Sequence, residues 1–298
     1  MRHNQAMRLG LALLLLVAPA VAVAEPLTMT AATHGSFLEL TFTNTSKKPL
    51  EMTTHVYAGL DHYDWLAVTL SGKTKRTLHF TEARTKAIPK NATIAPGKSI
   101  TKRVDLVLWS IHGDNGDPLA PDTYDVEATW DTTAQQAGPK LKLAAKTKLV
   151  LAAPVEKGCT ERAPAKTGLV LLARQVPKTS TIEVGLHNVD TVEHCVAGHI
   201  ATHELQSDWL SVTVPEKTAS RTIVFDDARD KSARVTVALA PGATVWTRWD
   251  VVAWAKRARN GGKAPSRWNT SATATYDASR EPDVWRGAIK TSFGLQLP

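Results

Sequence analysis

Cysteine is scarce in this chain of 298 residues, and the two that occur, Cys159 and Cys195, both lie in its second half. There is no Cys-x-x-Cys pair, so neither a thioredoxin-like redox site nor a paired-cysteine zinc site is indicated. In an oxidising compartment an isolated pair usually forms one disulfide. The sequence therefore predicts a Cys159–Cys195 bridge, which would contribute about 3 to 4 kcal/mol by the chain-entropy model.

Catalytic and phosphate-binding motifs are also missing. The sequence has no Gly-x-Ser-x-Gly elbow, no phosphate loop and no His-Glu-x-x-His helix. Because no activated nucleophile accompanies the histidines, we expect no catalytic residues and no cofactor. An enzyme of unknown type is therefore the least favoured functional hypothesis.

Long apolar runs are confined to the N-terminus, where Arg2 and Arg8 precede an apolar run over residues 9–24. This run ends in Ala22-Val23-Ala24, the small-residue pattern of a signal cleavage site. It contains Pro19 and is shorter than the roughly 20 residues that a spanning helix needs. We therefore predict a signal peptide over residues 1–24, a periplasmic or extracellular protein, and no membrane insertion after cleavage.

A strong excess of one charge is absent too. Removing Arg2 and Arg8 from the 36 basic residues leaves 34 against 28 acidic ones, so the mature net charge is +6. The excess is spread thinly along the chain, so nucleic acid is not an expected partner.

The mature chain repeats itself at an offset of 144 to 146 residues, which predicts two domains over residues 25–153 and 154–298. The copies are diverged but collinear. The matched landmarks are His55 with His199, Asp64-Trp65-Leu66 with Asp208-Trp209-Leu210, Arg76 with Arg221, Ala95-Pro96-Gly97 with Ala240-Pro241-Gly242, Asp105 with Asp250, and Trp109 with Trp254.

Within each copy, short runs of alternating apolar residues are separated by turn signals such as Pro96-Gly97. Helical periodicity is absent outside the signal, and several short strands at this spacing favour a sandwich. The predicted fold class is all-β, with two tandem immunoglobulin-like β-sandwich domains after the signal peptide.

Four segments of the first copy carry a family resemblance. They are Phe42-Thr43-Asn44-Thr45-Ser46-Lys47-Lys48-Pro49-Leu50, Tyr63-Asp64-Trp65-Leu66-Ala67-Val68, Ile94-Ala95-Pro96-Gly97-Lys98-Ser99, and Leu119-Ala120-Pro121-Asp122-Thr123-Tyr124. The copy resembles, region for region, the bacterial intracellular proteinase inhibitor family, a small immunoglobulin-like sandwich. The resemblance implies this fold and, as an expectation, protease inhibition. The second copy lacks the Pro-x-Thr-Tyr element, and the chain departs from the family by being exported and duplicated.

Histidine is a candidate metal ligand, because His194, Cys195, His199 and His203 fall within ten residues of one another. Zinc needs three or four convergent ligands, and Cys195 is assigned to the disulfide, so we predict ordinary strand-edge histidines and no metal site. His55 and His199 occupy equivalent positions beside Asp64 and Asp208. We expect them to have a structural role, with the side chain bonded to backbone or a neighbouring carboxylate.

Tryptophans fall into two groups. Trp65, Trp109, Trp209 and Trp254 recur at matched positions and are predicted core residues, whereas Trp246, Trp249, Trp268 and Trp285 have no matched tryptophan. Exposed members of the second group would indicate a carbohydrate or protein contact.

One loop differs in electrical sign between the copies. Residues 110–118 after Trp109 are acidic and rich in turn formers, whereas the loop after Trp254 is basic. Charge runs usually face water, so one interpretation is that both loops are solvated tips. The alternative is that the basic loop binds an acidic protein face or an anionic polymer. The residues of this candidate binding loop are Lys256, Arg257, Arg259, Lys263 and Arg267.

Two functions are carried forward. The preferred hypothesis is a non-enzymatic secreted binding protein of the bacterial envelope, which recognises a protein or surface polymer through loops at the ends of its sandwiches. The alternative is a secreted protease inhibitor, which the family resemblance implies.

Overall fold

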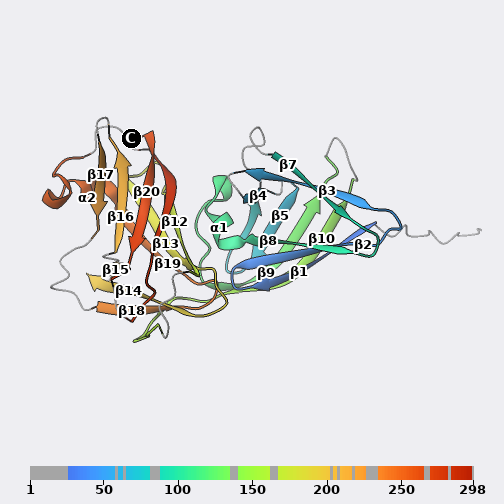
Figure 1. Ribbon diagram of the computed structural model, residues 1–298, viewed down its shortest axis with the longest axis horizontal. Helices are drawn as coiled ribbons and strands as arrows, with labels where there is room; N and C mark the ends of the chain where they lie inside the picture. The colour runs from blue at the N-terminus through green and yellow to red at the C-terminus, as the bar shows by residue number, and fades with distance from the viewer. Residues whose placement is uncertain are drawn as a thin grey trace, which may run out of the picture.

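The computed structural model confirms that the protein is all-β (Figure 1). The predicted signal peptide lies outside the residues that the structure describes. These are residues 26–57, 60–62, 65–80, 88–134, 140–161, 167–201, 204–206, 209–216, 219–225, 234–264, 269–280 and 283–296.

Three sheets make up the first half of the described chain, with strand orders β1-β2-β8, β10-β9-β5-β6 and β4-β3-β7. All of their pairings are antiparallel. The strands are β1 (Leu27–His34), β2 (Phe37–Asn44), β3 (Leu50–Tyr57), β4 (Leu60–His62), β5 (Leu66–Ser71), β6 (Lys75–His79), β7 (Ile88–Ile94), β8 (Ser99–Asp105), β9 (Asp122–Asp131) and β10 (Lys142–Leu151).

The second half repeats this pattern strand for strand, with orders β12-β13-β19, β17-β16-β20-β21 and β11-β18-β14-β15. Only the short β11 has no counterpart among the described strands of the first half. The strands are β11 (Val155–Glu156), β12 (Leu169–Gln175), β13 (Thr181–Asn188), β14 (His194–Ala201), β15 (Glu204–Gln206), β16 (Leu210–Pro215), β17 (Ser220–Val224), β18 (Arg234–Leu239), β19 (Thr244–Asp250), β20 (Asn269–Asp277) and β21 (Ala288–Gln296).

The arrangement of strands is that of an immunoglobulin-like sandwich. Strands β1, β2 and β8 correspond to A, B and E, and β5, β9 and β10 correspond to C, F and G. Tyr124 near the start of β9 donates its hydroxyl hydrogen to the Ala120 carbonyl at 2.8 Å, which is the tyrosine corner of this fold. The same Tyr124 belongs to the Pro-x-Thr-Tyr element on which the family resemblance rested.

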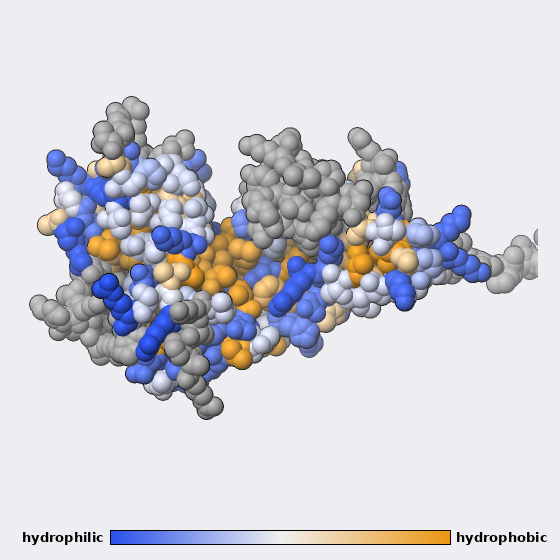
Figure 2. Space-filling view, in the orientation of Figure 1, coloured by the Kyte–Doolittle hydropathy of each residue, from blue (hydrophilic) through white to orange (hydrophobic). Residues whose placement is uncertain are grey.

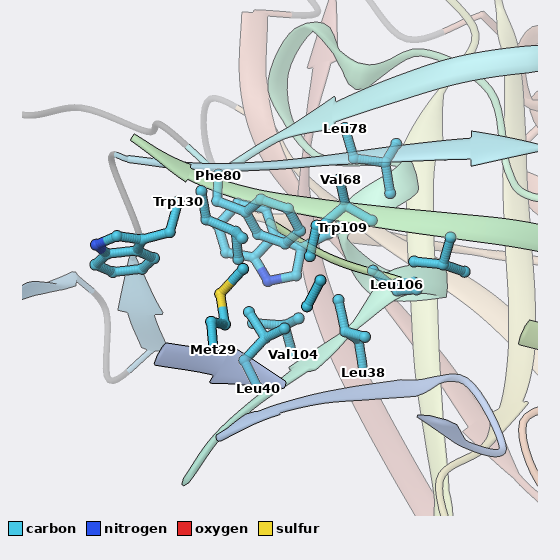
Figure 3. Close-up of a cluster of buried hydrophobic side chains, with 14 of the residues drawn as sticks. Met29, Leu38, Leu40, Val68, Leu78, Phe80, Val104, Leu106, Trp109 and Trp130 are labelled. Atoms are coloured by element: carbon cyan, nitrogen blue, oxygen red, sulfur yellow. The ribbon is translucent and has the colours of Figure 1, made fainter. Parts of the chain in front are cut away.

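Alternating side chains fill the core between the sheets of the first half (Figure 3). Leu38, Leu40 and Phe42 of β2 point inward and are buried. Phe42 meets Trp130 of β9 edge-on, with ring centroids 5.1 Å apart. Each such buried side chain contributes about 1.5 to 3 kcal/mol by removal of apolar surface from water. The second half has an equivalent core around Val184, Val212, Phe225 and Tyr276.

Two short helices were not predicted from the sequence: α1 (Leu106–Ser110) and α2 (Val251–Ala255), followed by the 3₁₀ turns η1 (Gly113–Asn115) and η3 (Ala258–Asn260). The Asp105 carboxylate accepts hydrogen bonds from the first turn of α1, and the matched Asp250 does the same for α2. A helix of five residues is too short to show a 3.6-residue period in the sequence. The sequence feature that marks each helix is its N-cap aspartate, which recurs as Asp105 and Asp250. Neither helix is long enough to span a membrane, and none elsewhere in the described chain is either.

The two halves meet at an apolar contact. Leu172 of β12 is buried in the core cluster of the first half, and Val170 and Trp246 of the second half pack against the same cluster. Figure 2 shows apolar residues gathered where the halves meet. Because these residues lie on the outer face of the β12-β13-β19 sheet, the first half covers that face.

Candidate functional site

The surface of the first half that contacts the second half is here named the α1 end. It comprises the Gly35–Ser36 turn, Asp105 and the loop over residues 111–118. The Gly35 turn lies against the Pro241–Gly242 turn so closely that a Cβ on Gly242 would come within 2.4 Å of the Ser36 nitrogen. The matched Gly97 of the first half has no atom within 4 Å of such a Cβ. Gly97 and Gly242 both have a positive φ, which glycine adopts without strain. At Gly242, close packing also excludes any side chain, because a Cβ would clash with the Gly35–Ser36 turn.

A buried polar cluster lies at the centre of this contact. The His187 imidazole Nε2 is 3.1 Å from Ser36 Oγ and 3.0 Å from Asp105 Oδ2, and its Nδ1 is 2.7 Å from Thr244 Oγ1. Ser36 and His187 are fully buried. A hydrolytic triad places the carboxylate and the serine on opposite ring nitrogens, whereas here both share Nε2. The cluster therefore holds the two halves together and has no arrangement for proton relay.

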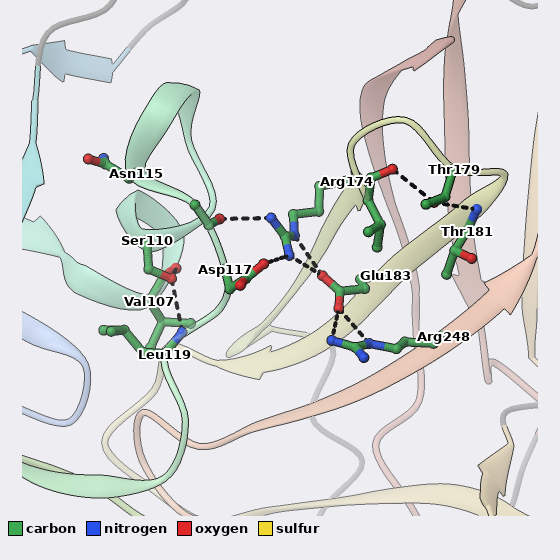
Figure 4. A network of polar contacts seen from close by, with 12 residues as sticks. Val107, Ser110, Asn115, Asp117, Leu119, Arg174, Thr179, Thr181, Glu183 and Arg248 are labelled. Atoms are coloured by element: carbon green, nitrogen blue, oxygen red, sulfur yellow. Dashed lines mark hydrogen bonds and ion pairs between the residues drawn. The ribbon is translucent and has the colours of Figure 1, made fainter. Parts of the chain in front are cut away.

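A chain of alternating charges forms the rim of the contact (Figure 4). Asp117 of the acidic loop lies 2.6 Å from Arg174 of β12, which lies 2.6 Å from Glu183, and Glu183 also pairs with Arg248 at 2.5 Å. Arg174 further donates to the Gly116 carbonyl at 2.8 Å. The hydrogen bond from Arg174 lowers the pKa of the Asp117 carboxyl below its usual value. The acidic loop thus contacts the second half through Asp117 and the Gly116 carbonyl, while the Asp117 side chain itself stays 83% exposed.

Both copies build this loop on the same scaffold. Arg76 of β6 donates to the Ser110, Asn115 and Asp117 carbonyls, and Arg221 of β17 donates to the Lys263 carbonyl at 2.9 Å. Asn115 donates to the Trp109 carbonyl at 2.9 Å, and the matched Asn260 donates to the Trp254 carbonyl at 3.0 Å. The backbone of the loop is therefore preserved between the copies, and its exposed side chains are what differ.

The corresponding surface of the second half, here named the α2 end, comprises residues 176–180, Asp250 and the loop over residues 256–263. Figure 1 places α2 on the side of the second half away from the first. Ser180 donates to Asp250 at 2.8 Å, and Asp250 is exposed. Desolvation is the largest single contribution and acts to raise the pKa of Asp250. Hydrogen bonds from Ala253, Ser180 and Val252 outweigh it and lower that pKa.

Four of the five residues of the candidate binding loop lie at the α2 end, and all four are exposed: Lys256, Arg257, Arg259 and Lys263. The fifth, Arg267, lies outside the described residues. The Arg257 guanidinium stacks 3.6 Å from the centroid of the Trp254 ring.

The predicted disulfide is confirmed, with Cα atoms of Cys159 and Cys195 5.9 Å apart. It ties the segment entering the second half to strand β14. Beside it, His194 is buried and bonds Glu161 at 2.8 Å and Asp190 at 3.3 Å. No group of three or more potential ligands able to hold a metal ion occurs in the described parts of the chain.

His55 and His199 have equivalent backbone positions. His55 of β3 lies opposite His62 and Pro89, and His199 of β14 lies opposite Gln206 and Arg234. Their side chains are not among the described ones, as is also true of His203. Their expected structural role therefore stays a prediction.

Tryptophans are found in cores and at the contact between the halves. Of the matched set, Trp109 and Trp254 are buried, and Trp65 and Trp209 are half-buried against core clusters. Among the described residues, no unmatched tryptophan is exposed. Trp249 and Trp285 are buried, Trp246 packs against the first half, and Trp268 lies outside the described residues.

Sequence analysis missed the contact between the halves, although signals for it were present. The strongest is Gly185, where a Cβ would come within 2.8 Å of the Trp246 ring. Gly185 and Trp246 are paired across strands β13 and β19, where the first copy has Thr41 and Thr101. A glycine inside a strand, beside a tryptophan that the other copy lacks, indicates that another surface approaches closely there.

Comparison with known proteins leaves the family open. No family model and no curated protein matches the chain. Among solved structures, it is similar to red sea bream transglutaminase, with 12% identity and a TM-score of 0.23 over 90% of this chain and 31% of that chain. It is also similar to the collagen adhesin of S. aureus, with 9% identity and a TM-score of 0.20 over 90% of this chain and 91% of that one. These scores are too low to carry an argument about function.

Proposed function

We propose that this protein is a non-enzymatic binding protein of the bacterial envelope that recognises a protein or an anionic surface polymer through a sandwich end. The observation that carries the proposal is that the α1 end is already a binding surface. Through Asp105, Ser36 and Asp117 it holds the outer face of the β12-β13-β19 sheet. The α2 end has the same scaffold and faces away from that contact.

Charge determines what the α2 end can hold. Where the first copy has Ile111, the second has Lys256, and where the first presents Asp117, the second presents Lys263 one residue later. Exposed basic side chains attract an anionic partner and speed its encounter, and salt screens this attraction. The partner class that fits this surface is therefore acidic.

Export of the protein is part of the proposal. A formed disulfide is typical of an oxidising compartment, and the described helices include none that could anchor the chain in a bilayer.

The test is capture of envelope material on immobilised mature protein at low salt and at about 1 M salt, where screening extends over about 3 Å. We expect a partner that binds the parent protein at low salt and is lost when Lys256, Arg259 and Lys263 are changed to serine. The matched control changes three exposed lysines of β10, Lys142, Lys146 and Lys148, to serine.

Two results would overturn the proposal. One is capture that the α2-end variant and the β10 variant retain equally. The other is inhibition of a member of a panel of serine, cysteine and metalloproteases, since this would favour the inhibitor alternative.

A further inference from the structure

We propose that His194 is a proton-operated lock on the Cys159–Cys195 disulfide, which it protects from reduction while its ring is protonated. The observation that carries the inference is a buried cluster in the second half, which joins the segment around Cys159 to strand β14. This segment, residues 157–161, is here named the strap. The inference does not depend on the proposed function.

The strap lies against β18 and β14. The Lys157 amide donates to the Thr236 carbonyl at 3.2 Å, and the Cys159 amide donates to the Thr236 hydroxyl at 2.9 Å. Two residues beyond Cys159, the Glu161 carboxylate accepts a hydrogen bond from the Cys195 amide at 2.8 Å. Glu161 therefore fixes the end of the strap beside the residue that carries the second sulfur.

His194, the first residue of β14, holds Glu161 in place. Its Nδ1 lies 2.8 Å from Glu161 Oε1, and its Nε2 lies 3.3 Å from Asp190 Oδ2. The side chain of His194 is 2% exposed and that of Glu161 is 9% exposed. The segment before β12 closes over the ring at Gly168, where a Cβ would clash with His194 Nε2 and with the Asp190 carboxylate. The ring is thus enclosed between two carboxylates.

Two carboxylates around one imidazole require the charged ring. An ionised carboxylate only accepts hydrogen bonds, and a neutral imidazole has a single N–H to donate. Both contacts are therefore hydrogen bonds only when both ring nitrogens carry a proton. The pKa of Asp190 is lowered, first by the hydrogen bond from the Thr191 amide and further by the hydrogen bond and charge of His194. Asp190 is consequently ionised throughout the range in which histidine titrates.

His194 is the one cation paired with Glu161 in the part of the chain that the structure describes. Of the other charged groups on the neighbouring segments, Lys157 pairs with Glu193 at 3.1 Å and Asp283 is exposed. When the ring loses a proton, the Glu161 carboxylate has no opposite charge beside it, and an unpaired charge is costly to bury. The hold on the strap is therefore strong below the ordinary histidine value of about 6.5 and weakens as the pH rises.

Reduction by a dithiol takes place in two steps. The thiolate of the reagent bonds to one sulfur, the S–S bond breaks, and the other cysteine leaves as a thiolate that takes up a proton. Cys159 is half-buried and lines an open cleft of about 450 Å³, whereas Cys195 is 3% exposed, so Cys159 is the sulfur that a reagent can reach. The second thiol of the reagent then displaces Cys159. The protein gains two electrons and two protons, and the reagent becomes a disulfide.

The lock acts between these two steps. While Glu161 stays bound to β14, the Cys195 thiolate remains beside the mixed disulfide and expels the reagent, because a tethered group reacts at high effective concentration. Once the ring is neutral, the strap separates more readily and the second step proceeds. The first half has Leu50 and Glu51 at the places of His194 and Cys195, so the lock and the disulfide occur together in the second half.

The test is the rate at which excess dithiothreitol reduces the disulfide of the mature protein and of His194→Gln, between about pH 5.5 and about pH 8.5. Mass spectrometry after alkylation counts the free thiols. The ratio of the two rates at each pH cancels the greater reactivity of the reagent at high pH. We expect the variant to react about tenfold faster at the acidic end, where it lacks a charge-assisted hydrogen bond, and as fast as the parent at the alkaline end.

Lys157→Gln is the matched control, because it removes the exposed ion pair with Glu193 from the same strap and touches no histidine. It should change the rate by the same factor, less than about fivefold, at every pH. Asp190→Asn keeps the test valid if His194→Gln fails to fold, since the Asp190 side chain is 38% exposed. It preserves an acceptor but removes a charge, so it should raise the rate about threefold near pH 6 and leave it unchanged at the alkaline end.

A ratio for His194→Gln that is the same at every pH overturns the proposal, because a merely structural histidine would give that result. An Asp190→Asn protein that follows the parent across the whole range also overturns it. Nitrogen NMR of the parent ring provides a reading without any substitution. Both nitrogens of His194 should carry a proton at the acidic end and one should lose it by the alkaline end, and a ring that is neutral throughout would refute the lock.

Discussion

Strands β2 and β13 occupy the same place in the repeat, yet their environments differ. In β2, buried and half-buried residues alternate strictly, as expected of a strand with one face on a core. In β13, every residue after Thr181 is buried, including Glu183, His187 and Asn188. The inner faces are alike, so the difference lies in what covers the outer face. The first half of the chain covers β13, and β2 has no such cover among the described residues.

This comparison shows how a duplicated domain can diverge without altering its framework. Asn44 and Asn188 each bond the backbone in the same way, to Lys48 and Ile94 in one copy and to Val192 and Leu239 in the other. The framework bonds are shared, and the substitutions that distinguish the copies are concentrated on the outer sheet face and the end loop.

The largest expected effect concerns the disulfide, which belongs to the second half alone. Changing Cys159 and Cys195 to serine should lower the free energy of unfolding by about 3 to 4 kcal/mol, because the open chain gains entropy when unfolded. Calorimetry should place the loss in the second half. An equal shift for both halves would show that the contact between them, and not the bridge, limits stability.

Arg174, which pairs with buried Glu183, should contribute more to stability than Arg103, which pairs with Glu39 on the first half. Arg174→Ala leaves the buried Glu183 carboxylate with only the exposed Arg248, so we expect a loss of about 2 to 3 kcal/mol in urea unfolding. For comparison, Arg103→Ala removes the counterpart of Arg248 from beside partly exposed Glu39 and should cost less than about 1 kcal/mol. Equal costs would mean that burial of Glu183 is not what makes its ion pairs strong.

His187 tests the centre of the contact. His187→Ala leaves Ser36 and Asp105 buried with one hydrogen-bonding group fewer, which should cost about 1 to 2 kcal/mol. It should also loosen the two halves, as measured by small-angle scattering and by proteolysis between them. Thr43→Ala, at the matching position, should change stability by less than about 0.5 kcal/mol and leave the shape unaltered. A His187→Ala protein with unchanged scattering would contradict the inferred role.

Asp117 gives the smallest effect, and it depends on pH. Its folded pKa is lowered by the hydrogen bond from Arg174, so the stabilisation is fully present above the unfolded aspartate pKa of about 3.9. It is lost as the pH falls through the lower folded value. An NMR titration of the Asp117 carboxyl should show this lowered pKa, and Arg174→Ala should return it towards the ordinary value. A pKa unchanged by Arg174→Ala would refute the pairing as its cause.

Much of the fold and part of the site were predictable. Alternation in segments such as β2 indicates strands because side chains of a strand point to opposite faces every second residue. The start of the end loop could be located from the matched Trp109 and Trp254, and the binding role of this loop stays a prediction. The helices α1 and α2 escaped prediction, since one turn of helix has no detectable period.

The sequence by itself determined the all-β class, the internal repeat and the Cys159–Cys195 bridge, because local alternation, self-similarity and a lone cysteine pair need no knowledge of distant neighbours. Only the tertiary structure decided which end binds which face. His187 meets Ser36 across 151 residues of chain, and Arg174 meets Asp117 across 57. Whether a polar residue on an outer face is solvated or buried depends on what packs over it. The alternation of apolar and polar residue types in the sequence of its own strand does not distinguish the two cases.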